Sequence, residues 1–168
     1  TIILTAAIDF CRPEQHVFFN FLSIKGSEGK QASNYDNGDS YCDNNLLQNN
    51  TITGGSVGIT LFSSTSSGLM TGNKIVGNTI SNAIGYGIQM QYTSGTLIEG
   101  NVISGGPDAN YGLIGMYLDV YNDSYVISKN TIHGFHLISG TPPAYALYIG
   151  SESVAGKGSL ISNNLIYD

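Results

Sequence analysis

Charged residues are scarce in this sequence, and basic ones are the scarcest. Asp, Glu, Lys and Arg make up 11% of the 168 residues, less than half of what is usual in soluble domains. Six Lys and Arg stand against twelve Asp and Glu, which gives a formal net charge of −6. We expect no nucleic-acid partner, because such proteins use basic patches to displace counterions from phosphates. A polar surface built from Asn, Ser, Thr, Gly and Tyr is typical of secreted or cell-surface proteins.

Long apolar runs and metal-binding cysteine patterns are also missing. The apolar stretch 1–8 is too short to span a membrane and has no basic flank, so we expect no membrane insertion. Since the sequence starts at Thr1, we expect any signal peptide or larger N-terminal part to be already absent. The two cysteines, Cys11 and Cys42, are too few for a zinc site. In an exported protein we expect them to form a disulfide worth about 2–4 kcal/mol; two buried free thiols are the alternative.

What the sequence does contain is a repeat. An aliphatic residue, an Asn three positions later and an Ile two positions after that occur together five times after residue 45. Successive asparagines of the pattern are 28, 23, 29 and 34 residues apart. Periods in this range indicate a solenoid. The five copies are Leu47–Ile52, Ile75–Ile80, Ile98–Ile103, Ile127–Ile132 and Ile161–Ile166.

A second short segment recurs between these copies, and its apolar residues alternate with others as in a β-strand. No segment shows a sustained helical period. Each repeat therefore predicts three short strands, and stacked coils would pair equivalent strands about 4.8 Å apart. The recurring segments are Gly58–Phe62, Gly87–Gln91, Gly115–Asp119 and Ala146–Gly150.

The repeated Asn is predicted to be structural rather than a ligand. Asn tolerates the unusual backbone angles of a sharp bend. Its amide can also bond the equivalent Asn of the next coil, as amides do in stacked identical chains. The predicted ladder consists of Asn50, Asn78, Asn101, Asn130 and Asn164.

These repeats resemble the parallel β-helix repeats of the right-handed, pectate-lyase-like superfamily. The resemblance implies an all-β fold: a right-handed, single-stranded parallel β-helix, here of about five coils with three short strands each. We predict β-helix repeats over residues 46–168, with residues 1–45 forming strands and a polar loop that start or cover the helix. The superfamily includes polysaccharide lyases, polygalacturonases, epimerases, phage tailspikes and bacterial surface proteins, so the fold alone does not select a function.

The polar segment 25–45 is predicted to be a long loop. Its acidic residues Asp36, Asp39 and Asp43 could supply oxygen ligands to calcium, although their spacing fits no EF-hand loop. The alternative is a solvated turn, since Asp and Asn favour tight bends. Otherwise we expect no cofactor.

In the resembling enzymes the substrate groove follows the outer face of one sheet, and the second recurring segment is the candidate for that sheet. Strand alternation turns its non-aliphatic residues outward. Their rings and amides could bind a polysaccharide or a cell-surface glycan, or they could be ordinary strand decoration. Candidate carbohydrate-binding residues are Gln89, Gln91, Tyr117, Tyr121 and Tyr148. The predicted outward columns are Thr60, Gln89, Tyr117, Tyr148; Phe62, Gln91, Asp119, Gly150; and Ser64, Thr93, Tyr121, Glu152.

Catalysis has weaker support in the sequence. A lyase of this superfamily usually needs a basic residue in the groove, and the outward columns contain neither Lys nor Arg. A hydrolase needs two facing carboxylates; Asp119 and Glu152 would lie roughly 8 Å apart. His133 is the candidate acid or base, with a surface histidine on a polar bend as the alternative.

Three functions remain open from the sequence. The leading hypothesis is a structural or adhesive β-helix module, secreted or on the cell surface, that contacts carbohydrate without catalysing a reaction. The alternatives are a polysaccharide lyase or glycoside hydrolase acting on the same face, and a phage tailspike-type segment. Because Asp168 lies in mid-coil, we also expect a further domain or chain to cover the C-terminal coil.

Overall fold

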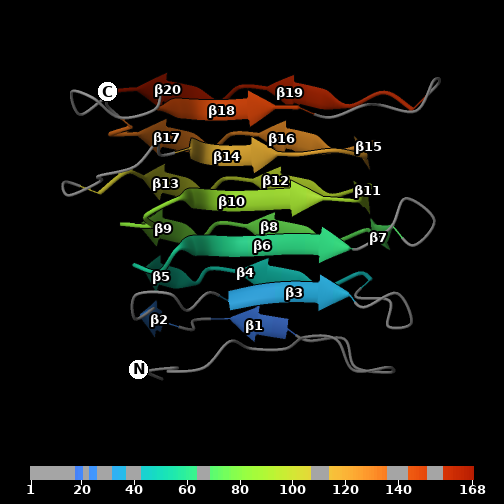
Figure 1. Ribbon diagram of the computed structural model, residues 1–168, viewed down its shortest axis with the longest axis horizontal. Helices are drawn as coiled ribbons and strands as arrows, with labels where there is room; N and C mark the ends of the chain where they lie inside the picture. The colour runs from blue at the N-terminus through green and yellow to red at the C-terminus, as the bar shows by residue number, and fades with distance from the viewer. Residues whose placement is uncertain are drawn as a thin grey trace.

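The chain winds into a stack of strand-built coils in the computed structural model (Figure 1), which describes residues 18–20, 23–25, 32–36, 43–63, 69–106, 114–135, 144–150 and 157–168. Helices are absent from these residues. The strands are β1 (Phe18–Asn20), β2 (Ser23–Lys25), β3 (Ala32–Asp36), β4 (Leu46–Gln48), β5 (Thr51–Thr53), β6 (Val57–Ser63), β7 (Met70–Thr71), β8 (Lys74–Val76), β9 (Thr79–Ser81), β10 (Tyr86–Gln91), β11 (Thr93–Ser94), β12 (Leu97–Glu99), β13 (Val102–Ser104), β14 (Ile114–Leu118), β15 (Asn122–Asp123), β16 (Val126–Ser128), β17 (Thr131–His133), β18 (Tyr145–Ile149), β19 (Leu160–Ser162) and β20 (Leu165–Tyr167).

Equivalent strands of successive coils pair in parallel and form sheets along the stack. One sheet runs β1-β4-β8-β12-β16-β19 and a second runs β2-β5-β9-β13-β17-β20. The third, β3-β6-β10-β14-β18, faces the viewer in Figure 1, and we call its solvent side the outer face. A small sheet, β7-β11-β15, adds a fourth strand to the middle coils. The predicted solenoid of parallel strands is confirmed.

The first coil begins earlier than the repeat pattern indicated. Phe19 pairs with Leu47 and Ile24 pairs with Ile52, so β1 and β2 occupy the two positions of the repeat. Sequence reasoning missed this copy because Leu22 stands where the later coils have Asn. Two sheets therefore contain six strands among the described residues, not the five expected. The predicted loop 25–45 was also wrong in part, since it contains β3, which pairs with β6.

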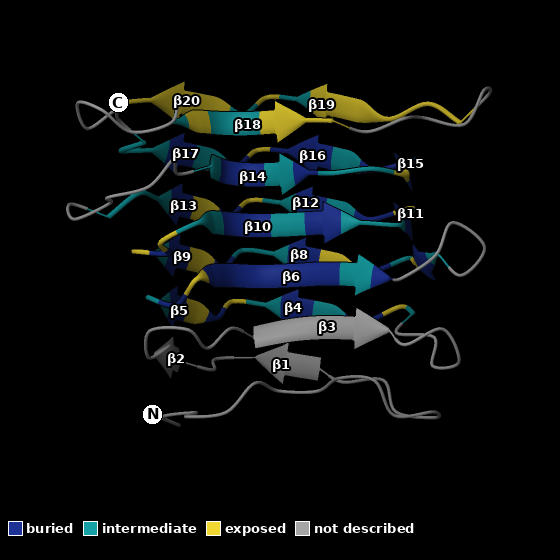
Figure 2. Ribbon diagram, in the orientation of Figure 1, coloured by how far each residue is buried: buried dark blue, intermediate teal, exposed yellow. Residues whose placement is uncertain are grey.

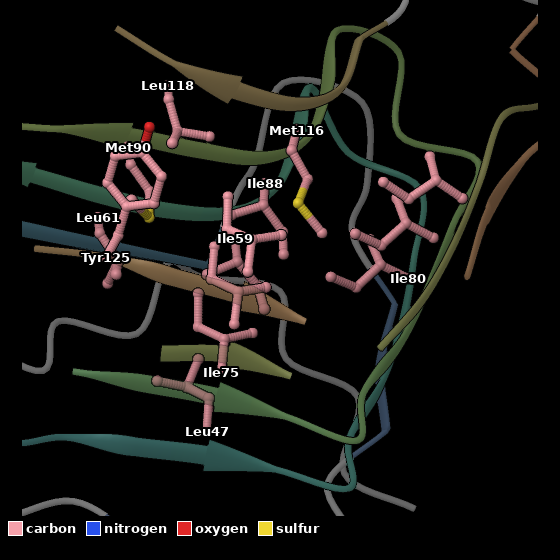
Figure 3. Packing of buried hydrophobic residues seen from close by; sticks show 14 of the residues in the cluster. Leu47, Ile59, Leu61, Ile75, Ile80, Ile88, Met90, Met116, Leu118 and Tyr125 are labelled. Atoms are coloured by element: carbon pink, nitrogen blue, oxygen red, sulfur yellow. The ribbon is translucent and has the colours of Figure 1, made fainter. Parts of the chain in front are cut away.

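Aliphatic side chains of successive coils stack into columns inside the helix (Figure 3). The Ile pairs of the repeat form two columns, and the alternating residues of β6, β10 and β14 form two more. Burying each such side chain stabilises the fold by about 1.5–3 kcal/mol. The members that are at most 1% exposed are Ile59, Leu61, Ile75, Ile80, Ile88, Met90, Ile98, Ile103, Met116, Leu118, Ile127 and Ile132.

Polar side chains occupy the bend between the first two sheets. The backbone N and Nδ2 of Asn78 both donate to Oδ1 of Asn101, at 2.8 and 3.0 Å. Asn101 donates in the same way to Oδ1 of Asn130, both at 2.9 Å. Its Nδ2 also reaches the carbonyl oxygen of Ile75 in the preceding coil, at 2.8 Å. The pattern continues from Asn50 to Asn164, and it supplies partners to buried amides that would be costly to leave unpaired.

The last coil differs from the coils beneath it (Figure 2). Ile161 and Ile166 continue the two Ile columns, yet they are 42% and 52% exposed. Leu147 and Ile149 were predicted to lie inside, but Leu147 is half-buried and Ile149 is 42% exposed. The reason is that no described residue stacks on their other side.

Candidate functional site

Tyrosine rings line the outer face from β10 to β18. The ring of Tyr117 lies between those of Tyr86 and Tyr148, with centroid distances of 4.8 and 5.2 Å and interplanar angles of 17° and 27°. Tyr145 tilts onto Tyr148 at 5.7 Å. Tyr145 and Tyr148 are about 40% exposed, whereas Tyr86 and Tyr117 are half-buried. We call these four residues the tyrosine stack.

The pairing of β14 with β18 explains part of the stack, because it sets Tyr117 directly beside Tyr148. Tyr86 joins from a position that alternation would turn inward, the same side as Ile88. Alternation breaks here because Gly87 and Ile88 are both buried. A Cβ on Gly87 would lie 2.5 Å from the carbonyl oxygen of Gly115, so this corner requires glycine. Sequence reasoning missed Tyr86 because regular strand alternation would turn its side chain inward.

Mutual stacking changes what the tyrosines offer to a ligand. We expected flat apolar ring surfaces, but both faces of the Tyr117 ring are covered by neighbouring rings. Solvent therefore meets phenol hydroxyls and ring edges along most of the stack. Such stacked pairs also stabilise the fold by about 0.5–1.5 kcal/mol each.

Asp119 is the acidic neighbour of the stack. It directly follows β14, two residues beyond Tyr117, and is half-buried. The pKa of the Tyr117 phenol is raised, first by burial, then by the negative charge of Asp119 and by the neighbouring Tyr86 and Tyr148; a hydrogen bond to the Asp119 carboxylate adds to the effect. The phenol thus stays protonated and donates to Asp119 at neutral pH.

A second pair of tyrosines flanks the same region. Tyr92 and Tyr121 stack at 5.1 Å with an interplanar angle of 11°. Both have φ of 55°, a left-handed backbone conformation that is costly for bulky residues. We call this pair the bend stack. Tyr92 was not among the predicted site residues.

The third predicted outward column was wrong at Thr93. This residue is fully buried, and its Oγ1 donates to Oδ1 of Asn122 at 2.9 Å. Ile88 pairs with Met116 at an offset of 28 residues, but Thr93 pairs with Asn122 at an offset of 29. The additional residue in the later coil shifts the register, so that Tyr121 meets Tyr92. Thr60 of the first column is also only 5% exposed.

The predicted catalytic residues are not brought together in the described part of the chain. His133 ends β17, which belongs to a different sheet from β14, and its ring stacks on Tyr167 at 5.0 Å. Asp119 lies on the outer face, and Glu152 lies outside the described residues. Gln89 and Gln91 are half-buried on β10, where Gln89 pairs with Tyr117.

Of the predicted calcium ligands, Asp43 accepts a hydrogen bond from the backbone N of Thr71 at 2.6 Å. Asp36 lies in β3, and Asp39 lies outside the described residues, as do both cysteines of the predicted disulfide, Cys11 and Cys42. Within the described ranges, no group of three or more His, Cys, Asp or Glu side chains is arranged to hold a metal ion.

One buried carboxylate lies apart from the outer face. Asp123 in β15 is 2% exposed, accepts a hydrogen bond from Oγ of Ser94, and lies 3.4 Å from the Lys157 ammonium. Its partners come from the neighbouring coils. Asp123 therefore joins three coils.

Comparison with known proteins agrees with this architecture. A family model described as a right-handed beta helix region matches residues 22–168. No curated protein and no solved structure matches the chain. The matched region includes every strand from β2 onward. The chain belongs to the right-handed β-helix family.

Proposed function

We propose that this β-helix is a non-catalytic module that binds carbohydrate on its outer face and serves a structural or adhesive role in a secreted or cell-surface protein. The observation that carries the proposal is the tyrosine stack, which presents phenol groups from three successive coils on one side of the molecule.

The chemistry of the face suits sugar hydroxyls. A phenol both donates and accepts a hydrogen bond, and a Gln side chain offers two donors and an acceptor. Gln89 and Gln91 bring such amides next to the stack. Phenols also contribute apolar ring edges, which suit the C–H groups of a sugar ring. The face thus combines the two properties that a carbohydrate surface requires.

The absence of a second acid beside Asp119 in the described residues favours binding over cleavage. A glycosidase uses two carboxyl groups that flank the scissile bond. Strands β6, β10, β14 and β18 contain no Asp or Glu. Asp119, the residue directly after β14, brings a carboxylate to the outer face. His133 is on another sheet and stacks on Tyr167.

A glycan array followed by affinity electrophoresis tests the proposal. The protein should be retained by at least one polysaccharide without releasing reducing ends from it. Tyr117→Phe keeps the ring but removes the hydroxyl, and it should weaken retention about two- to tenfold, the value of one hydrogen bond.

Tyr167→Phe is the matched control, because Tyr167 is an exposed tyrosine that stacks on His133 in a different sheet. This variant should bind as the unmodified protein does. Retention by no polysaccharide, or equal losses in the two variants, would contradict the proposal. Release of reducing ends would show that the module is an enzyme.

A further inference from the structure

Between the two sets of tyrosines lies a polar strip. Gln91 and Asp119 are neighbours on adjacent coils, because Met90 pairs with Leu118 immediately before them. The tyrosine stack lies on one side of them along the strand, and the bend stack follows them on the other. We call Gln91 and Asp119 the polar lane. It runs along the helix axis, across the strands.

The direction of the lane favours a linear polymer as ligand. Ring centroids repeat at 4.8 to 5.2 Å from coil to coil, which is about the spacing of paired strands. A ligand that lies along the axis therefore meets a tyrosine ring in each of three successive coils and the polar lane in two of them. An extended polysaccharide offers hydroxyls in every sugar unit, and one unit spans about one coil.

The charges near the lane select among polysaccharides. Asp119 is part of the lane, whereas the lysines with described partners are paired with other carboxylates: Lys129 pairs with Glu99 at 2.7 Å, and Lys157 pairs with Asp123 at 3.4 Å. None of the strands β6, β10, β14 and β18 contains a Lys or Arg. A uronate carboxylate on the lane would meet a like charge without a cation from these strands, which disfavours binding.

We infer that the outer face selects an uncharged polysaccharide, lying along the helix axis between the tyrosine stack and the bend stack, and that Asp119 makes it discriminate against polyuronates. This inference rests on the proposed function. It adds the class of ligand, the direction in which the ligand lies, and the residue that sets the selectivity.

Affinity electrophoresis at low and high salt tests the inference with three probes: a mixed-linkage β-glucan, cellohexaose as a soluble competitor, and polygalacturonate. The unmodified protein should be retained by the glucan, released from it by cellohexaose, and retained much more weakly by polygalacturonate. Asp119→Asn keeps a hydrogen-bond acceptor for Tyr117 but removes the charge. It should strengthen binding to polygalacturonate about two- to fivefold at low salt, and the gain should shrink at high salt.

Glu99→Gln is the control for net charge, because it removes one negative charge from a different sheet. It should leave the retention of the protein by both the glucan and polygalacturonate unchanged. The inference is overturned if polygalacturonate binds as tightly as the glucan, or if Asp119→Asn does not differ from Glu99→Gln. Those results leave the proposed function standing. Retention by no polysaccharide on the array would instead remove the proposed function itself.

Discussion

Two sets of side chains recur from coil to coil in this molecule: the asparagine ladder in the bend has a member in five coils, and the tyrosine stack spans three coils of the outer face. Asn101 is fully buried, and its amide is bonded to coils on both sides. Tyr148 repeats Tyr117 at nearly the same spacing, but it is 39% exposed. Repetition alone therefore does not identify a functional residue. What separates the two sets is exposure: the ladder amides are buried between coils, whereas the tyrosine stack reaches solvent at Tyr145 and Tyr148.

This difference predicts opposite outcomes for the two sets. Substitutions in the ladder should change stability and leave binding of the folded protein unchanged. Substitutions in the stack should change binding more than stability. The following experiments test that separation, beginning with the largest expected effect.

Asn101→Leu should destabilise the protein by about 2–5 kcal/mol, because it leaves the two donors of Asn78 buried without an acceptor. Urea unfolding followed by circular dichroism measures the loss. Thr79→Leu, a polar-to-leucine change at an exposed strand position, is the control and should have little effect. An unchanged unfolding free energy for Asn101→Leu would show that the ladder does not stabilise the coils.

Gly87→Ala should cost about 1–3 kcal/mol through overpacking. Its Cβ would lie 2.5 Å from both the Gly115 carbonyl oxygen and Cγ2 of Ile103. Gly158→Ala is the matched control, because a Cβ there meets nothing within 4 Å. Since the break in alternation that turns Tyr86 outward occurs at Gly87, the variant should also weaken glycan retention. Equal unfolding free energies for the two variants would contradict this view of the corner.

Tyr117→Leu should lower the unfolding free energy by about 1–3 kcal/mol, because it removes two stacked aromatic pairs worth about 0.5–1.5 kcal/mol each. That is less than the loss expected for Asn101→Leu, while the loss of glycan retention should be greater. Urea unfolding and affinity electrophoresis of the same preparations give both values. If Tyr117→Leu proved the more damaging to stability, the stack would be a structural element of the same kind as the ladder.

The smallest effect concerns alkaline pH. The pKa of the Tyr117 phenol is raised above its ordinary value of 10.0 in the folded state, by burial first and by Asp119 second. The folded protein therefore holds this proton more tightly than the unfolded chain does. Its contribution to stability is complete below about pH 10 and is lost as the pH rises through the folded pKa.

Absorbance titration of the phenolate, compared between the unmodified protein and Tyr117→Phe, isolates this group. The difference curve should have its midpoint above that of a free tyrosine, and Asp119→Asn should shift the midpoint downward. A difference curve centred on the free-tyrosine value would show that the pKa of Tyr117 is not raised, and an unchanged midpoint in Asp119→Asn would show that Asp119 does not act on Tyr117.

The repeated parts of the fold could be predicted from the sequence because one physical constraint acts on each coil in the same way. Ile98 and Ile103 must point inward, and Asn101 must fill the bend between them, so the pattern is visible without a structure. The first coil was not recognised in the sequence because it has Leu22 where the later repeats have Asn, although Phe19 and Ile24 keep the register.

The site was harder to predict because it depends on departures from the repeat. Gln89 and Tyr117 follow from strand alternation, and the structure does pair them. Tyr86 depends on a break in alternation at Gly87, and the stacking of Tyr92 on the predicted Tyr121 depends on a register shift of one residue. Stacking between rings also has no trace in the sequence of a single coil. It follows only from the distance between coils.

The unequal repeat lengths have a consequence for how such a protein changes over generations. Asn78 bonds Asn101 across 23 residues, and Asn101 bonds Asn130 across 29, with nearly the same geometry. A deletion of residues 78–100 would therefore bring Asn101 next to Asn50 and close the helix again, one coil shorter. It would also remove Tyr86 and Tyr92. Gain or loss of whole coils by recombination can thus lengthen or shorten the tyrosine stack while the buried columns of the remaining coils stay the same.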